Sequence, residues 1–238
     1  MSDKTSERKR YLVVEIESAI GAMIVSGRAA GGERLTTDLL PPQLRSVSRN
    51  IWREAMQQLS VRGLVQPIKR KGTVVTARSQ WNLLDLQVLR WFGETGKAHE
   101  LVRDMSEIRW MIEPFAARLA AERASEAELE AINAAFAALQ SYVAGTLTDP
   151  LVDTRLHVAI LTASGNAMLR GLRPVMAHIM DASLSVTTVP VTEASVAKAL
   201  EIHEDVVRAI NDRDPARAEA TMRELVRFAY EPWGGVVG

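Results

Sequence analysis

The sequence predicts a mainly α-helical protein with two parts, an N-terminal winged helix-turn-helix and a C-terminal, all-α antiparallel helical bundle. Residues 47–75 have the pattern of a helix followed by a short basic hairpin. Beyond residue 80, apolar residues recur with the helical period, and the alternation typical of strands is almost absent. Charge is divided between the parts, because residues 1–80 contain 14 Lys and Arg against 7 Asp and Glu, whereas residues 81–238 contain 15 against 22.

Bulk composition limits the class of protein. The 238 residues are enough for one large or two ordinary domains, and the absence of cysteine excludes disulfides and thiolate metal sites. The N-terminus is polar and no apolar run approaches roughly 18 residues, so we expect a cytoplasmic protein that is neither secreted nor membrane-spanning. The positive excess of residues 1–80 predicts a module that binds a polyanion, joined to a body that does not.

The first predicted helix covers residues 7–26 and ends at Gly27. Its apolar stripe consists of Ile16, Ile20, Met23 and Ile24. Polar residues 36–38 then form a cluster suited to cap a helix. Two prolines follow at positions 41 and 42, and they cannot lie inside a helix. Any helix in this segment is therefore short and starts at the prolines.

The central helix starts at Ser48 and has two different sides. Its apolar side can dock on a small core and carries Ile51, Ala55 and Leu59. Its polar side carries Arg49, Asn50, Arg53 and Gln57. These guanidinium and amide groups are the ones that clamp phosphates and contact base edges in the major groove. Strands at 64–67 and 72–76 follow, joined by a cationic tip. The alternative interpretation is an ordinary amphipathic helix with a solvated charged face.

We place the domain boundary in a polar linker, so that residues 1–78 form the winged domain and residues 79–238 form the helical domain. Helices in the second domain are predicted at 83–94, 98–123, 126–144, 150–163, 166–186, 195–212 and 215–229. Sequence signals for their starts are a capping box at Ser125 and Glu128, and the pairs Asp149-Pro150 and Asp214-Pro215. Pro174 should kink the helix that contains it.

Polar side chains on apolar helix faces mark a candidate site in the second domain. Asp153 and His157 are one turn apart, and His203 lies likewise among apolar residues. Such groups must be paired, bound to a ligand or hydrated, so they are either ligands of a divalent metal or satisfied core residues. Arg109 also shares a face with apolar residues. It is either one member of a buried pair with Glu113 or the cation that receives the carboxylate of an effector.

Several short motifs resemble the GntR-type winged-helix repressors. They are Gly32-x-x-Leu35, Val47-Ser48-Arg49-x-x-x-Arg53-Glu54-Ala55, Gly63-Leu64 and Gly72-x-x-Val75. The helical half, with Glu113-Pro114-x-Ala116-Ala117 and Asp153-x-x-x-His157, resembles the FadR subgroup and its FCD domain. Residues 80–91 are similar to the interdomain segment of the galactonate-responsive branch. The chain departs from the family at residues 38–42, where a Glu-x-x-Leu-Ala pattern is missing, so we expect the first helix of the helix-turn-helix to be shortened or shifted.

The resemblance implies residues for each site. The DNA-binding residues are Thr36, Thr37, Arg45, Ser48, Arg49, Asn50, Arg53, Lys69, Arg70, Lys71, Gly72 and Thr73. Metal-binding FCD domains use Asp-x-x-x-His and a later histidine, which implies a divalent metal of the zinc or nickel class held by Asp153, His157 and His203. The family's further histidine corresponds to Leu225, which leaves three ligands unless His178 substitutes. Arg109 and His178 are expected at the effector.

These features predict a homodimeric, DNA-binding transcriptional regulator and not an enzyme. We expect a repressor of sugar-acid catabolism that a small carboxylate, such as an aldonate, releases from a palindromic operator. One alternative is a metal-dependent hydrolase that uses Asp153, His157 and His203 as ligands, although no histidine-glutamate motif supplies a general base. Another is an activator or a constitutive DNA-binding protein, which would differ in its response to an effector.

Overall fold

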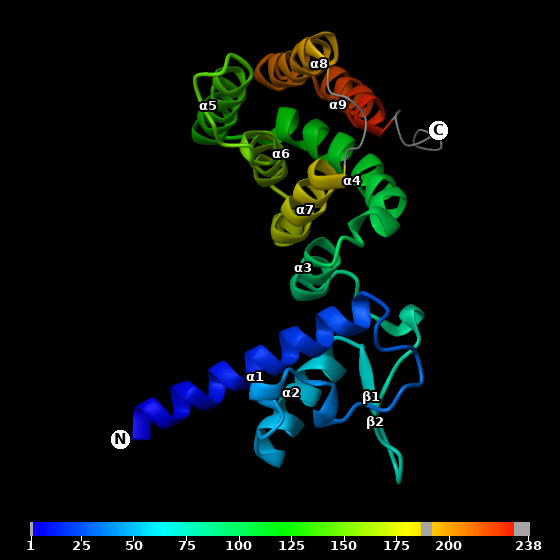
Figure 1. The fold of residues 1–238 in the computed structure, drawn as a ribbon. Helices are drawn as coiled ribbons and strands as arrows, with labels where there is room; N and C mark the ends of the chain where they lie inside the picture. The colour runs from blue at the N-terminus through cyan, green and yellow to red at the C-terminus, as the bar shows by residue number, and fades with distance from the viewer. Residues whose placement is uncertain (1, 187–191, 231–238) are drawn as a thin grey trace. The chain divides into compact units, whose positions relative to one another are not determined.

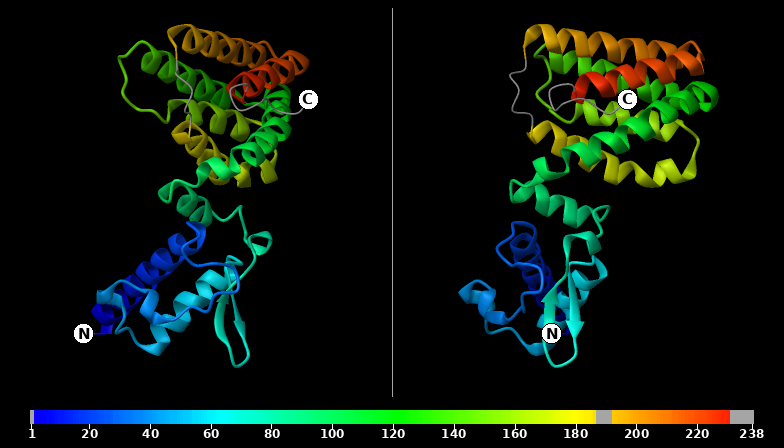
Figure 2. Two further views of the ribbon diagram at one scale, coloured as in Figure 1. Left: turned by 45° about the vertical axis from the view of Figure 1, so that its right-hand side comes forward. Right: turned by 90° about the vertical axis from the view of Figure 1, so that its right-hand side faces the viewer.

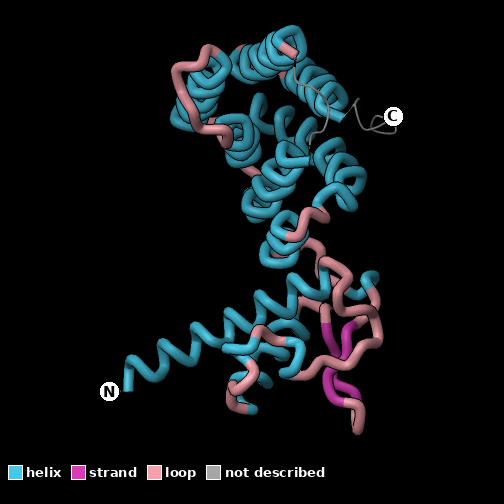
Figure 3. The backbone as a smooth tube through the Cα atoms, viewed as in Figure 1, coloured by secondary structure: helices cyan, strands magenta, loops and turns pink. Residues whose placement is uncertain are grey.

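The structure is a computed structural model and describes residues 2–186 and 192–230, with side chains described from residue 6 onward and not for residues 183–186 (Figure 1). The chain forms two compact units, which divide between Ala98 and His99. Each has a core of its own and is described by itself. Figure 3 shows that the described strands lie in the first unit and that helices make up nearly all of the second. No helix among the described residues is both long enough and apolar enough to cross a membrane.

The first unit is a small helical core with a two-stranded hairpin beside it. Helix α1 (Ser2–Val25) packs against α2 (Arg49–Val61) and α3 (Leu86–Glu94). Strands β1 (Val65–Ile68) and β2 (Gly72–Val75) pair antiparallel along their whole length. In Figure 1 the hairpin projects away from the three helices. Helix α2 with a projecting hairpin beside it is the arrangement of a winged helix-turn-helix, so this prediction is confirmed.

The segment between α1 and α2 contains two 3-10 turns in place of an α-helix. These are Thr37–Leu39 and Pro42–Leu44, and the second has Pro41 at its N-cap position. The expected short helix that starts at the prolines is therefore confirmed. Proline lacks the amide hydrogen that an α-helix interior needs, so the chain is limited to single turns here. Leu40 and Leu44 are buried, and they attach the segment to the core of the unit.

Interactions of α3 join it to the first unit. The Arg62 guanidinium lies 3.1 Å from the Glu17 carboxylate of α1 and 3.1 Å from the Asp85 carboxylate at the start of α3. The buried ring of Trp91 packs against Gly21 of α1. Residues 79–98 therefore belong to this compact unit, whereas the point at which the DNA-binding function ends, placed at residue 78 by the sequence, stays a prediction.

The second unit is an all-α bundle. Its helices are α4 (Val102–Arg123), α5 (Glu126–Val143), α6 (Val152–Ala163), α7 (Ala167–Val186), α8 (Glu193–Asn211) and α9 (Pro215–Tyr230). Helix α4 packs along α9 and also contacts α6, α7 and α8, while α5 packs on α6 and α9 packs on α8 (Figure 2). The fully buried core includes Ile132, Leu156, Ile160, Val206 and Ile210. This arrangement confirms the predicted helical bundle.

Helix starts were predicted with mixed success. The capping box of Ser125 and Glu128 is present at α5, and α9 starts at Pro215 as expected. The prediction for Asp149-Pro150 was wrong, because α6 starts only at Val152. The Asp149 carboxylate accepts a hydrogen bond from the backbone N–H of Leu151 and so forms a turn that precedes the helix. Helix α7 continues through Pro174.

Candidate functional site

Buried polar side chains from four helices meet inside the second unit. Arg109 and Glu113 come from α4, His157 from α6, His203 from α8 and Tyr230 from α9. All five are buried, and Glu113 is only 1% exposed. Asp153, one turn before His157, is half-buried beside them. Because each lies on the apolar face that directs its helix into the core, burial of these groups is a direct result of the helical period.

Arg109 and Glu113 form a bidentate ion pair. Arg109 Nε lies 2.5 Å from Glu113 Oε1, and Arg109 Nη2 lies 3.3 Å from Glu113 Oε2. Burial alone would raise the pKa of Glu113, but Arg109 and His157 outweigh it and lower that pKa to about 2. Burial likewise disfavours the charged guanidinium, yet Glu113 holds the pKa of Arg109 above its ordinary value. Arg109 was expected either to pair with Glu113 or to receive an effector carboxylate, and in the structure it forms the buried pair with Glu113.

Both histidines have one ring nitrogen oriented by the protein and the other directed at Asp153. His203 Nδ1 lies 2.7 Å from the carbonyl oxygen of Ala199, to which it can only donate. His157 Nδ1 lies 2.6 Å from Glu113 Oε2, although the two are not aligned as a hydrogen bond. The Nε2 atoms of His157 and His203 then lie 3.9 and 2.9 Å from Asp153 Oδ1. Neutral imidazoles with this tautomer would direct two lone pairs at one carboxylate oxygen.

This arrangement fits a divalent cation. One ligand atom from each of Asp153, His157 and His203 lies within 4.8 Å of the others, and His203 Nε2 is buried without a hydrogen-bond partner. Burial opposes ionisation of Asp153, but positive charge on the two imidazoles and on Arg109 outweighs it and holds the pKa well below the ordinary value, and a bound cation would act on Asp153 in the same sense. Outer partners that orient each imidazole are the usual support of metal-binding histidines. Two nitrogens and one oxygen suit zinc or nickel.

The other residues expected near this centre lie elsewhere. Leu225 is buried in the apolar core, where it offers no ligand atom. His178 is half-buried on α7 and is not among the grouped ligand atoms. The sequence did not indicate Tyr230, whose hydroxyl lies 3.3 Å from Arg109 Nη1, because these residues are far apart in the chain and only tertiary packing joins them. It also missed the 2.7 Å hydrogen bond from the Thr154 hydroxyl to the Asp181 carboxylate.

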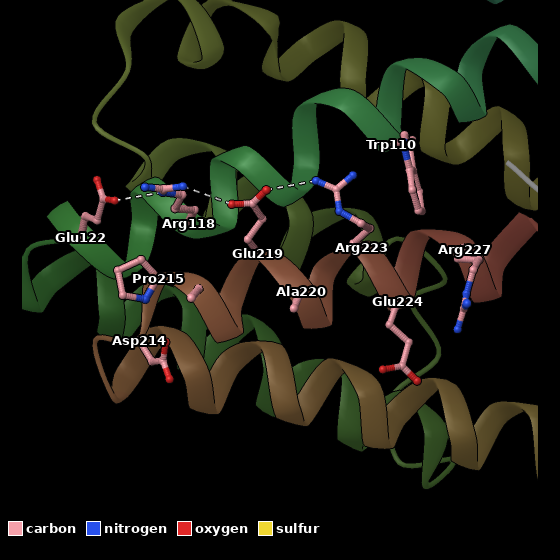
Figure 4. A pocket seen from close by; sticks show the side chains of 11 residues that line it. Trp110, Arg118, Glu122, Asp214, Pro215, Glu219, Ala220, Arg223, Glu224 and Arg227 are labelled. Atoms are coloured by element: carbon pink, nitrogen blue, oxygen red, sulfur yellow. Dashed lines mark hydrogen bonds and ion pairs between the residues drawn. The ribbon is translucent and has the colours of Figure 1, made fainter. Parts of the chain in front are cut away.

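A second hollow in this unit contains none of the predicted ligands. It is a groove of about 670 Å³ between α4 and α9 (Figure 4). Arg118 and Arg223 both pair with the Glu219 carboxylate, and the Arg223 guanidinium lies 4.9 Å from the centre of the Trp110 ring. Arg118 and Arg223 are therefore already compensated by a carboxylate of the same groove and are not free to receive an anionic effector.

The first unit presents the residues expected at DNA. Ser48 caps α2 by accepting a hydrogen bond from the N–H of Ile51, and the next turn exposes its polar side. The exposed side chains of this turn are Arg49, Asn50 and Arg53, and those of the hairpin tip are Lys69, Arg70, Lys71 and Gly72, with Thr73 half-buried. Arg70, in the tight connection between β1 and β2, has a left-handed backbone with φ of 68°, which is uncommon for a residue other than glycine.

The residues predicted to contact the DNA backbone are Arg45, Thr36 and Thr37, and two of them form hydrogen bonds within the protein. Arg45 donates from Nε to the carbonyl oxygen of Leu40 at 2.9 Å, so its guanidinium is held against the proline segment. Thr36 donates to the Asp38 carboxylate and does not cap the following turn. Thr37 is half-buried in that turn. These three residues lie in the same unit as the exposed turn of α2.

Comparisons with known proteins decide what kind of protein carries this site. Residues 12–75 match the gntR family of bacterial regulatory proteins, and residues 104–228 match the FCD domain. The galactonate operon transcriptional repressor of Escherichia coli (strain K12) is 31% identical over 207 residues, which cover 87% of this chain and 90% of that protein. The chain belongs to the GntR family.

Other relatives agree with this assignment. The transcriptional regulator LutR of Bacillus subtilis (strain 168) is 29% identical over 208 residues, covering 84% of this chain and 91% of that protein. The solved structure of Streptococcus agalactiae GntR has the same fold, with a TM-score of 0.52 and 20% identity over 98% of this chain and 100% of that one. This GntR protein, of the FadR subgroup, is therefore a DNA-binding transcriptional regulator with a domain for a small-molecule effector. Its relatives are regulators and not enzymes, so the hydrolase alternative is dropped.

Proposed function

We propose that this GntR protein is a homodimeric repressor of sugar-acid catabolism and that a small carboxylate, such as an aldonate, releases it from its operator. The observation that supports this best is the buried cluster of Asp153, His157 and His203 beside the Arg109–Glu113 pair. The relative described as a galactonate operon repressor supports the sugar-acid class. Within this family the winged units of two copies would read two half-sites of a palindromic operator.

In this proposal the three ligands hold a divalent cation of the zinc or nickel class. With neutral imidazoles, the cluster of Arg109, Glu113 and Asp153 has one cation and two carboxylates, a net charge of −1. A divalent ion would change this to +1, and one effector carboxylate would then neutralise it. The cation would act as a Lewis acid toward that carboxylate and an adjacent hydroxyl. Arg109 Nη1, which faces the Tyr230 hydroxyl rather than Glu113, is the guanidinium atom best placed for a second contact.

On the DNA side we propose base contacts by Arg49, Asn50 and Arg53 and phosphate contacts by the hairpin tip. A bidentate arginine contact with guanine is worth about 1–3 kcal/mol of discrimination, so loss of Arg49 or Arg53 should relax specificity at one base pair. The remaining proposed DNA-binding residues are Thr36, Thr37, Arg45 and Ser48. They would contact DNA phosphates and so fix the position of the protein on the duplex, without reading bases.

The metal and effector roles can be tested on the full chain by thermal denaturation. Zinc or nickel at about 100 times its dissociation constant should stabilise the protein by about 2.7 kcal/mol, and a chelator should remove this gain. His203→Ala should abolish the response, whereas exposed His99→Ala should retain it. Equal responses of the two variants would exclude the proposed ligand set. An aldonate should add a further shift only in metal-loaded protein.

The regulatory role needs a separate measurement. At fixed salt, the aldonate that stabilises the protein should weaken binding to an operator duplex selected from random sequences by its affinity for the protein, because release requires different effector affinities in the two states. Stabilisation by an aldonate without any change in DNA affinity would leave effector binding intact and rule out the proposed release mechanism. Tighter DNA binding would indicate an activator or a co-repressor.

A further inference from the structure

The first residues of α1 are rich in basic side chains and precede the segment that matches the gntR family. Helix α1 begins at Ser2, whereas the gntR family match begins at residue 12. Its charged side chains over residues 2–11 are Lys4, Arg8, Lys9 and Arg10 against Asp3 and Glu7. In Figure 1 this first part of α1 extends beyond the other helices of its unit. A helical extension with excess positive charge next to a DNA-binding surface needs a functional explanation.

An ion pair attaches this extension to the recognition helix. Lys9 Nζ lies 2.6 Å from Glu54 Oε2, and Glu54 follows Arg53 in α2. The sequence did not indicate a partner for Glu54 in α1, because the two residues are brought together only by packing of α1 on α2. The contact fixes which face of α1 looks toward the exposed turn of α2.

That face forms one wall of a groove of about 1080 Å³. From α1 the groove is lined by Ser6, Arg8, Lys9 and Leu12. The opposite wall is formed by Gln43, Ser46, Val47, Ser48, Asn50 and Ile51. Arg8 therefore shares a groove with Asn50, one of the proposed base-reading residues. Within the described part of the chain, exposed Arg8 has no hydrogen-bond or ion-pair partner.

We propose that the Arg8 face of α1 binds backbone phosphates of DNA beside the recognition helix. Its charge complements a polyphosphate, and through the groove the face is continuous with the α2 surface for which base contacts are proposed above, so this inference rests on that proposed function. In the view of Figure 1, the start of α1 and the hairpin tip lie on opposite sides of α2, so α2 would be flanked by two cationic contacts. Arg8 contributes affinity and register and does not read sequence.

The same helix offers a matched control. Residues 8 and 10 of a helix point in directions about 160° apart at 100° per residue. Arg10 accordingly lies with Glu7, Tyr11 and Val14 around a different hollow. Arg8→Ala and Arg10→Ala therefore remove the same charge from the same turn on opposite faces. Arg8→Lys retains the charge at the proposed contact.

The test measures binding of the full chain to a labelled, mixed-sequence DNA duplex by fluorescence anisotropy over a range of salt concentrations. Since the proposed contact is with phosphates, no operator sequence is needed. For wild type, the logarithm of affinity should fall linearly with the logarithm of salt concentration. Arg8→Ala should reduce this slope by about one unit per bound chain and lower the affinity several-fold at low salt. Arg10→Ala should match wild type, and Arg8→Lys should restore the slope.

Two results would overturn the proposal. One is a wild-type slope for Arg8→Ala. The other is an equal reduction in Arg8→Ala and Arg10→Ala, which would indicate only general charge. If that wild-type slope is accompanied by a change in oligomeric state, the Arg8 face contacts a second copy of the chain instead of DNA. Lys69→Ala in the hairpin tip distinguishes failure of the Arg8 contact from failure of the proposed DNA-binding function, because it should reduce the slope whether or not Arg8 contacts DNA.

Discussion

At the scale of single residues, position 21 of α1 has room for no side chain larger than the hydrogen of glycine. Alanine is normally favoured over glycine inside a helix by about 0.5–1 kcal/mol. At Gly21, however, a methyl group would overlap the six-membered part of the buried Trp91 ring. We expect Gly21→Ala to lower the free energy of unfolding by about 1–3 kcal/mol, the usual result of overpacking a core. Chemical denaturation measures this change.

Gly93 is the matched control for that experiment. It lies on α3, two residues after Trp91, and a methyl group there would meet no atom within 4 Å. Gly93→Ala should leave stability unchanged or raise it slightly, because only the helix preference acts. If both variants lose stability equally, the close packing of α1 on α3 is not what constrains Gly21.

The Arg109–Glu113 pair makes another prediction at this scale. Removing one member of a buried ion pair leaves an uncompensated charge and costs about 3–5 kcal/mol. Arg109→Met should therefore destabilise the protein by this amount in denaturant unfolding. The double variant Arg109→Met with Glu113→Leu should lose less than the single variant, since no buried charge is stranded. A double variant that loses the sum of both single effects would show that the two side chains stabilise the fold independently.

These residues also show what sequence reasoning reaches. Asp153, His157 and His203 were identified as polar groups on apolar faces, and the bundle brings them together. The helical period suffices for that, because it determines which side chains enter the core. It does not determine which of two buried partners a residue meets. Tyr230 approaches Arg109 only through the packing of α9 on α4, and no local pattern encodes that contact.

At the scale of elements, the start of α5 is defined by a reciprocal hydrogen-bond pair. Ser125 Oγ accepts from the N–H of Glu128, and the Glu128 carboxylate accepts from the N–H of Ser125 at 2.9 Å. Replacing an N-cap serine by alanine usually costs about 0.5–2 kcal/mol, so Ser125→Ala should destabilise the second unit by this amount. Thermal denaturation monitored by circular dichroism measures the loss. A change within error would show that the cap is dispensable in the packed bundle.

The same cap should make stability depend on pH. The hydrogen bonds from the Ser125 backbone N–H and hydroxyl lower the pKa of Glu128 below its ordinary value of 4.5. A carboxyl with a depressed folded-state pKa stabilises the fold above its unfolded pKa, and this contribution is lost as pH falls through the folded value. Glu128→Gln keeps the acceptor without titrating. Its stability should therefore fall less than that of wild type below pH 4.5, and parallel pH curves would contradict this.

Element identities were easier to predict than their ends. The central helix, hairpin and six bundle helices all occur, because long periodic segments have one stable way to bury their apolar residues. Ends depend on single hydrogen bonds. The Asp149-Pro150 signal produced a turn instead of a helix start, and α1 runs five residues further toward the N-terminus than its apolar stripe required. The sequence of residues 2–6 is polar throughout, so no apolar periodicity indicated that α1 begins at Ser2.

At the scale of the whole molecule, the two compact units predict two unfolding events. Each unit has its own apolar core, so each is expected to unfold cooperatively by itself. Differential scanning calorimetry of the full chain should resolve two transitions. Gly21→Ala should lower one of them, and zinc or nickel should raise the other. A single transition that both treatments shift would indicate that the units unfold together.

The charge division between the halves was the most reliable whole-chain signal. A net charge of zero conceals 14 basic against 7 acidic residues in the first 80 positions, and this excess belongs to the unit that matches the gntR family. Composition could not place the boundary of that unit. Asp85 and Trp91 tie residues 79–98 to α1 and α2, and such long-range contacts follow from packing alone.

The three candidate ligands also matter for the connectivity of the chain. Asp153 and His157 belong to α6, whereas His203 belongs to α8, so an ion held by all three would close the stretch of chain from position 153 to position 203 into a loop. Such a clip restricts the unfolded chain as a disulfide does, and the closure entropy grows slowly with loop length. A chain without cysteine would thus obtain a removable cross-link. Chelation would then act on the folding equilibrium of the bundle as well as on its affinity for an effector.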